Sequence, residues 1–171
     1  MTSQGMPNLT SSDGLVPKAG LGDEYETNGC RFKYVRCNAS TAIAAYACSH
    51  IAATGLITES TTTLVGTAAR PTTLCIPQFA LAVSEYGWAP IGPFGAETPY
   101  NDPATGVPVT FKVLAANAAT SVRLYTTITA GVLDDAVTTG NIAGLALTET
   151  VTTQEAADCV AVQRLVSFCE L

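Results

Sequence analysis

Short stretches in which apolar and polar residues alternate recur along the chain, and they predict strands. The clearest stretch is 107–113, in which every second residue is Val or Phe and the residues between are Pro, Thr and Lys. Successive side chains of a strand point to opposite faces, so this pattern is typical of a half-buried strand. Similar alternation predicts strands at 31–37 and 122–128, and apolar runs at 58–67 and 74–83 predict two more. Residues 142–147 and 160–168 supply the last predicted strands.

Roughly eight to ten short strands spaced about a dozen residues apart predict a mainly all-β fold, a single antiparallel β-barrel or β-sandwich. We place this domain at residues 23–171, with a loop rich in Pro and Gly at 90–106. Residues 41–54 combine helical spacing of apolar residues with many alanines, so both a helix and a strand stay open there. The fold therefore contains at most one or two short helices.

Residues 1–22 are rich in Ser, Gly and Pro and hold too few apolar side chains to pack as a domain, so we expect an extended N-terminal arm. A frayed terminus is one interpretation. The other is that apolar residues of the arm anchor it on a neighbouring subunit. The arm residues of this candidate interface are Leu9, Leu15, Val16 and Leu21.

Tyr86 and Trp88 are two residues apart, and Gly87 separates them. This spacing places both rings on one face of a strand, while the glycine would let another backbone approach the opposite face. Packing inside the domain is the simpler interpretation of the two rings. The alternative is an aromatic anchor in a subunit interface, where such side chains contribute disproportionately to binding.

Composition narrows the function classes. Hydrophobic residues make up 47% of the 171 positions and charged residues 13%, which fits one globular domain. Eight basic residues against fourteen acidic ones give a net charge of −6, and the basic residues are scattered, so we expect no direct nucleic-acid partner. No apolar window approaches the ~18 residues that span a bilayer, which argues against a membrane partner. The start lacks the apolar core of a signal peptide, so we expect folding in a cytoplasm.

The residues that carry catalysis or bind metals form no recognisable motif. Six cysteines include no Cys-x-x-Cys pair, and one histidine is too few for a typical zinc site, so we expect no metal and no cofactor. Most of the thiols would then be small buried hydrophobes, while a late disulfide stays open. Cys48 and His50 would share a face if their segment is a strand, as a nucleophile and its base do. Asp134 and Asp135 are adjacent and would diverge, so we predict no catalytic residue and no enzyme.

Several short segments, in their order along the chain, resemble the tailed-phage capsid decoration (cement, head-stabilising) proteins. The matching segments are 20–22 (Gly-Leu-Gly), 32–36, 40–45, 86–88 (Tyr-Gly-Trp), 113–135 and 144–147. The resemblance implies a structural virion protein that binds the outer surface of an icosahedral phage capsid and clamps neighbouring major capsid proteins. It also implies a homo-oligomer, most often a trimer, made in the host cytoplasm.

Two other function classes stay open. One is a different structural phage component, such as a tail or head-closure protein, which would be present in few copies. The other is a ligand-binding or enzymatic β-barrel that uses Cys48 and His50, which would have a deep pocket and a thiol of lowered pKa.

Overall fold

A computed structural model describes residues 8–27, 30–61, 73–92, 110–112, 124–134, 141–142 and 159–161 of the chain. These residues contain strands and no helix, which confirms the predicted mainly-β fold. None of them forms an apolar helix long enough to cross a bilayer. The strands are β1 (Glu24–Thr27), β2 (Cys30–Cys37), β3 (Ser49–Ile51), β4 (Leu56–Glu59), β5 (Thr73–Cys75), β6 (Tyr86–Gly92), β7 (Thr110–Lys112), β8 (Leu124–Thr126), β9 (Leu133–Asp134), β10 (Asn141–Ile142) and β11 (Cys159–Ala161).

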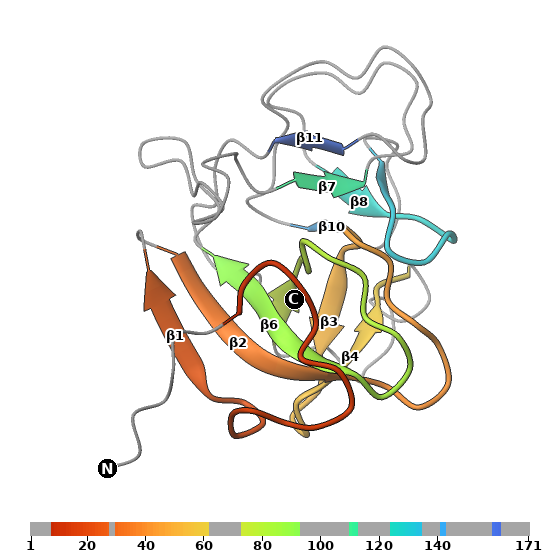
Figure 1. Cartoon of the computed structure of the whole chain (residues 1–171). Helices are drawn as coiled ribbons and strands as arrows, with labels where there is room; N and C mark the ends of the chain where they lie inside the picture. The colour runs from red at the N-terminus through yellow and green to blue at the C-terminus, as the bar shows by residue number, and fades with distance from the viewer. Residues whose placement is uncertain are drawn as a thin grey trace.

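The main sheet is organised around β2, its longest strand. Along one edge of β2, β1 pairs with its first half in the antiparallel direction and β4 pairs with its end in the parallel direction. Along the other edge, β2 pairs with β6 in the antiparallel direction. Strand β3 joins β4 to β5 through antiparallel pairs. The sheet curls into a half-barrel (Figure 1), and the backbone N–H of Ile76 after β5 donates to the Pro90 carbonyl of β6 at 3.2 Å. The sheet is therefore mixed, because one of its pairs is parallel.

The inside of the curl is an apolar core. Its buried residues come from β2, β3, β4, β5, β6 and the loops beside them: Val35, Cys37, Ile43, Ala47, Ile51, Ile57, Cys75, Leu81, Ala89 and Ile91. The alternation in β2 sends Phe32 and Tyr34 to the opposite face, and both are buried there as well. A strand that is buried on both faces needs a second covering layer, and part of that layer is the chain that precedes β1.

Two smaller sheets lie beyond the main one. Strands β10, β8 and β9 form the first, and β11 pairs with β7 in the second. Leu124 and Leu133 of the first sheet are fully buried. The backbone N–H of Cys48 donates to the Gly131 carbonyl at 2.9 Å, which ties the turn between β8 and β9 to the main sheet.

Several predicted elements are shorter in the structure than in the sequence pattern. In the ambiguous segment 41–54 only β3 is regular, and no helix forms. The run 74–83 keeps only β5, whose last residue precedes Ile76 and Pro77, and proline cannot donate to a ladder. Of the predicted loop 90–106, residues 90–92 belong to β6, and the remainder lies outside the described residues, as does most of 160–168.

Candidate docking surface

Residues 13–22, here called the arm loop, lie on the protein's own main sheet (Figure 1). The backbone N–H of Asp13 donates to the Tyr86 carbonyl at 2.8 Å, and the Tyr86 N–H donates to the Gly14 carbonyl at 2.9 Å. At the other end, the Gly22 N–H donates to the Tyr34 carbonyl at 2.8 Å. The predicted arm is therefore fixed to the sheet over these residues, and residues 1–7 lie outside the described part.

A side-chain clasp closes the arm loop at its middle. The hydroxyl of Tyr34 donates to Oδ2 of Asp13 at 3.0 Å and accepts the backbone N–H of Lys18 at 2.9 Å. The Lys18 ammonium bonds to the other Asp13 oxygen, Oδ1, at 3.0 Å. The Asp13 side chain is only 2% exposed, and burial together with the nearby Asp13 raises the pKa of Tyr34. The side chains of Tyr34 and Asp13 are therefore both shielded from water, and the hydrogen bond to the Asp13 carboxylate is stronger there than it would be in water.

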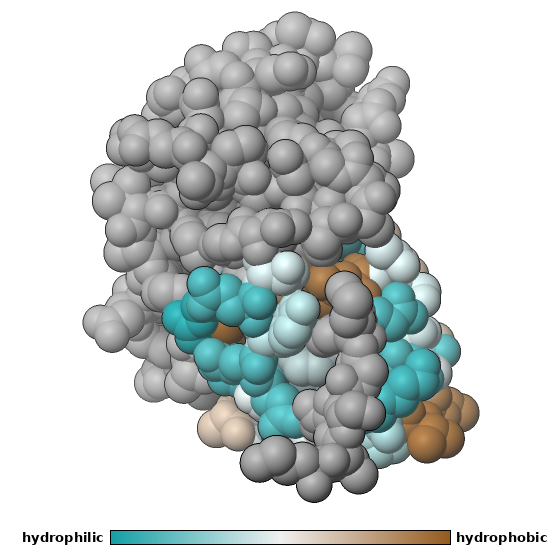
Figure 2. Space-filling view, turned by 60° about the vertical axis from the view of Figure 1, so that its left-hand side comes forward, coloured by the Kyte–Doolittle hydropathy of each residue, from teal (hydrophilic) through white to brown (hydrophobic). Residues whose placement is uncertain are grey.

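The clasp leaves two large apolar side chains of the arm loop in solvent. Leu15 is 68% exposed and Val16 is 72% exposed. Gly14 adopts φ +77°, a left-handed conformation that glycine allows, and the chain turns away from the sheet at this point. In Figure 2 a compact group of apolar side chains (brown) stands out at the lower right among hydrophilic neighbours. An exposed Leu-Val pair on a fixed loop is a surface that another molecule can bury without first ordering it.

The other two candidate residues of the arm differ from this pair. Leu9 is half-buried. Leu21 is 42% exposed and packs on the turn between β3 and β4, where a Cβ on Gly55 would lie 2.6 Å from its Cγ. Because Gly55 has no side chain, Leu21 fastens the end of the arm loop to the sheet. The prediction that Leu9 and Leu21 contact a neighbouring subunit stays a prediction.

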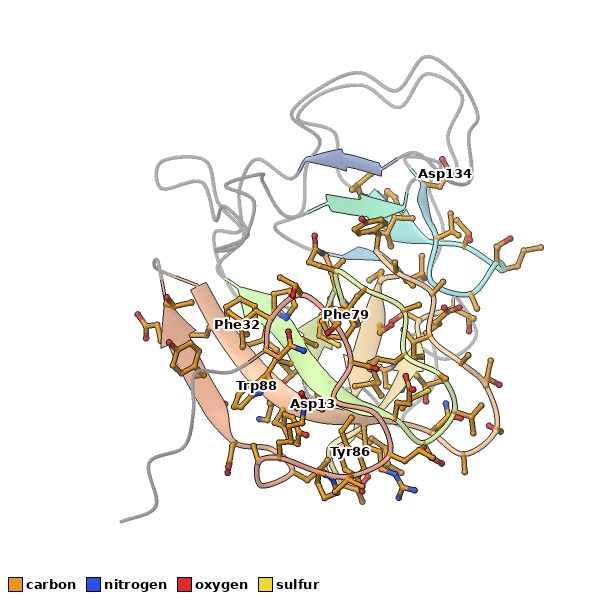
Figure 3. The ribbon with its side chains drawn as sticks, viewed as in Figure 1. Asp13, Phe32, Phe79, Tyr86, Trp88 and Asp134 are labelled. Atoms are coloured by element: carbon orange, nitrogen blue, oxygen red, sulfur yellow. The ribbon has the colours of Figure 1, made fainter. Side chains whose placement is uncertain are left out.

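Tyr86 and Trp88 lie under the arm loop (Figure 3), on the same face of β6 as predicted. The Tyr34 ring stacks on Tyr86 at 6.0 Å between centroids and contacts Trp88 at 5.0 Å. Trp88 is 7% exposed, so in the single chain it packs inside the fold. The space opposite, at Gly87, is filled by the side chains of Phe79 and Leu81 rather than by a backbone. The two rings support the arm loop from below.

Cys48 and His50 lie on one face of the β3–β4 pair, as the catalytic alternative requires. His50 pairs with Thr58, and the Ser60 N–H donates to the Cys48 carbonyl at 2.9 Å, which places Ser60 opposite Cys48. Burial lowers the pKa of His50, and its Nδ1 has no partner in the described part of the chain. Burial also raises the pKa of the Cys75 thiol well above its ordinary value and raises that of Cys37. Raised pKa values make Cys37 and Cys75 poor nucleophiles, because the thiolate is the reactive form.

Other binding features are modest in the part of the chain that the structure describes. Cys37, Cys48 and Cys75 are buried, and no cluster of three metal-ligating side chains occurs among the described residues. An open groove of about 350 Å³ lies between the end of the arm loop and the β3–β4 turn, lined by Leu21, Lys33 and residues 51–55. Its surface is mostly polar. The arm loop is thus the most distinctive surface of the described residues.

No model of a known protein family, no curated protein and no solved structure matches this chain.

Proposed function

We propose that this chain is a structural virion protein that binds the outer surface of an icosahedral phage capsid and stabilises it by clamping neighbouring major capsid proteins. The observation that carries the proposal is the arm loop, which displays Leu15 and Val16 from a backbone that hydrogen bonds fix at both ends. Such a surface can bind with little loss of conformational entropy, because hydrogen bonds already order the loop before binding. The proposal needs no catalytic residue.

The resemblance of segments 20–22, 32–36 and 86–88 to decoration proteins supports the same function, and these segments meet at the arm loop. Residue 22 bonds to Tyr34, and Tyr34 contacts both Tyr86 and Trp88. The acidic net charge of −6 would keep a particle covered by many copies soluble. The proposed partners are the major capsid protein and further copies of this chain in a homo-oligomer, most simply a trimer. Repetition over a lattice makes weak single contacts collectively tight.

The copy number in purified virions tests this proposal. Quantitative mass spectrometry of particles from the phage that carries the gene would measure this chain relative to the major capsid protein. We expect a ratio near one or a simple fraction of it. A handful of copies per particle would contradict the decoration role and favour a tail or head-closure protein, and absence from the particle would favour the ligand-binding or enzymatic alternative.

The arm loop can be tested separately with purified protein and with shells that lack this chain. Replacing both Leu15 and Val16 by Ser should abolish co-sedimentation with the shells, because it removes the displayed apolar surface. Val83→Ser is a matched control, since Val83 is also an exposed apolar residue, at 41%, but lies outside the arm loop. Equal binding by the double variant and the control would contradict the role of the arm loop.

A further inference from the structure

Arg36 of β2 lies beside the arm loop, with only the first residue of β6 between them. Tyr86 forms a β-bridge with Gly14 on one side and pairs with Arg36 on the other. Neighbouring strands are about 4.8 Å apart, so the Arg36 backbone lies about 10 Å from that of Gly14. The exposed side chains of Leu15 and Val16 follow Gly14 directly. Figure 3 shows Tyr86 at this end of β6.

Two contacts hold the guanidinium group of Arg36 in place. Its Cζ lies over the Tyr86 ring, 5.4 Å from the centroid, and its Nε donates to the Ser84 carbonyl at 3.4 Å. Ser84 adopts φ +66°, which is unfavourable for serine, and the Glu85 N–H closes this turn by donating to the Ala82 carbonyl at 3.0 Å. A guanidinium that is already stacked on a ring loses little freedom when it binds a ligand.

The charge of Arg36 has no acidic partner in the part of the chain whose side chains the structure describes. The other basic residues described there are each paired with a carboxylate: Lys18, Arg31 and Lys33. The carboxylate of Glu85, next to Ser84 in the sequence, accepts the Ala82 N–H at 3.0 Å. The two Nη atoms of Arg36 are absent from the buried polar atoms that lack a partner, so their N–H groups reach solvent.

A partner that buries the apolar tip of the arm loop also covers Arg36. A stable interface covers about 800 Å² on each partner, which corresponds to a patch of about 16 Å radius. Centred on Leu15 and Val16, such a patch includes Arg36. A covered guanidinium without a partner is costly, and a carboxylate placed against it removes that cost. The two Nη groups match the two oxygens of one carboxylate.

We propose that the guanidinium of Arg36 binds a carboxylate side chain on the capsid subunit that covers the arm loop. This inference rests on the proposed function and names the charge that the partner carries beside its apolar contact. A phosphate backbone fits less well, because it needs several cations and the chain has a net charge of −6. Arg36 then makes the arm loop selective against apolar surfaces that lack an acidic residue.

The test measures co-sedimentation of purified proteins with shells that lack this chain. Arg36→Gln removes the charge, and Arg36→Lys keeps the charge but not the planar fork. Arg31→Gln is the matched control, because it removes an arginine from the opposite face of the same strand. We expect Arg36→Gln to bind on the order of 10-fold more weakly than the wild type, Arg36→Lys to bind with intermediate affinity, and Arg31→Gln to bind normally. Added salt should weaken the wild type more than Arg36→Gln.

Folding of the variants is checked separately. Circular dichroism and thermal unfolding establish that each variant is folded. Amide exchange at Tyr86, whose N–H bonds to Gly14, establishes that the arm loop is still docked. If Arg36→Gln fails either check, Arg36→Lys carries the test, because a lysine ammonium can also lie over the Tyr86 ring.

The source of the carboxylate is identified with a carbodiimide, which joins an amine to a carboxylate. The reagent is applied to shells that have bound Arg36→Lys, and the joined peptides are read by mass spectrometry. A cross-link from position 36 to the major capsid protein supports the inference. A cross-link from position 36 to another copy of this chain overturns it.

Failure of this inference is distinguishable from failure of the proposed function. If Arg36→Gln binds like the wild type while the Leu15 and Val16 double variant does not bind, the carboxylate contact is overturned and the decoration function stands. Equal losses in Arg36→Gln and Arg31→Gln would assign the effect to overall charge and overturn the inference too. If the wild type itself does not bind shells, the proposed function is overturned together with the inference.

Discussion

The arm loop and the turn between β8 and β9, residues 127–131 and here called the apex turn, both expose large apolar side chains but differ in how closely they pack. Each contains a glycine with positive φ, Gly14 at +77° and Gly131 at +73°. A Cβ on Gly14 would meet nothing within 4 Å, whereas a Cβ on Gly131 would lie 2.6 Å from that of Ala47 and 3.1 Å from Cδ of Glu59. The space beside Gly14 in the arm loop is therefore open, whereas the space beside Gly131 in the apex turn is already filled. A polar clasp helps to hold the arm loop, and hydrogen bonds together with close packing hold the apex turn.

The difference indicates which substitutions each region tolerates. Close packing is sensitive to any added volume, because protein interiors have few voids that could absorb it. A polar clasp tolerates changes of shape but depends on each hydrogen-bonding atom, because an unpaired buried polar group is costly. Added volume should therefore destabilise the apex turn more than the arm loop, whereas loss of a hydrogen-bonding atom in the clasp should destabilise the arm loop.

The largest effect is expected for Gly131→Ala. The left-handed backbone and the clash with Ala47 should together lower the free energy of unfolding by about 3 kcal/mol. Gly14→Ala is the matched control, because it imposes the same backbone cost without a clash, and it should lose only about 1 kcal/mol. Urea denaturation of both variants measures the difference. Equal losses would show that close packing does not distinguish the apex turn.

An intermediate effect is expected for Asp13→Ala. The substitution removes the acceptor of the buried Tyr34 hydroxyl and the partner of Lys18, which should cost about 2 kcal/mol. Amide hydrogen exchange at position 13 and at Tyr86, whose N–H groups bond between the arm loop and β6, should become faster, while exchange at Gly131 should not change. Tyr34→Phe, which removes the same hydrogen bond from the other side, should have a comparable effect. Unchanged exchange in both variants would exclude the clasp as the element that fixes the arm loop.

The local strand pattern was predictable from the sequence, and Leu15 and Val16 were named from it as candidate interface residues, whereas the exposed position of Ile128 was not predicted. The predicted strand 31–37 matches β2, because strict alternation is a local property. The same reasoning places Ile128 in a strand over residues 122–128, and this is wrong. Strand β8 ends at Thr126, and Ile128 lies in the turn beyond it. Alternation does not mark where a strand ends when the next residues are also apolar or Thr.

The clasp and the direction of β4 depend on contacts between distant residues. Asp13 and Tyr34 are 21 positions apart, and no periodic pattern relates a carboxylate in a Gly- and Pro-rich arm to a tyrosine in a strand. The parallel pair of β2 and β4 was also missed, because side-chain alternation is the same for both directions. Strands joined by a short connection usually pair antiparallel, and this holds for β1 with β2 and for β3 with β4. Strand β2, however, pairs with β4, the second strand of the β3–β4 hairpin, and this pair is parallel.

The smallest effect is expected at Glu24 in β1, which follows the arm loop. A hydrogen bond from Arg31 lowers the pKa of Glu24 below its ordinary value of 4.5, and Lys33 contributes as well. A lowered folded-state pKa stabilises the protein above the unfolded-state value, and this contribution is lost as the pH falls through the folded-state pKa.

The Glu24 side chain is 42% exposed, so solvent screening limits the effect to about 0.5 kcal/mol. Glu24→Gln should therefore be slightly less stable than the wild type at pH 7, and 0.5 M salt should reduce this difference. The difference should also shrink as the pH falls below 4.5 and the carboxylate of the wild type becomes protonated. The apex turn should not respond, which amide exchange at Gly131 would show. A stability difference that does not shrink as the pH falls would mean that Glu24 acts through packing rather than charge, and the polar character assigned to the arm-loop side would then rest on the Asp13 clasp alone.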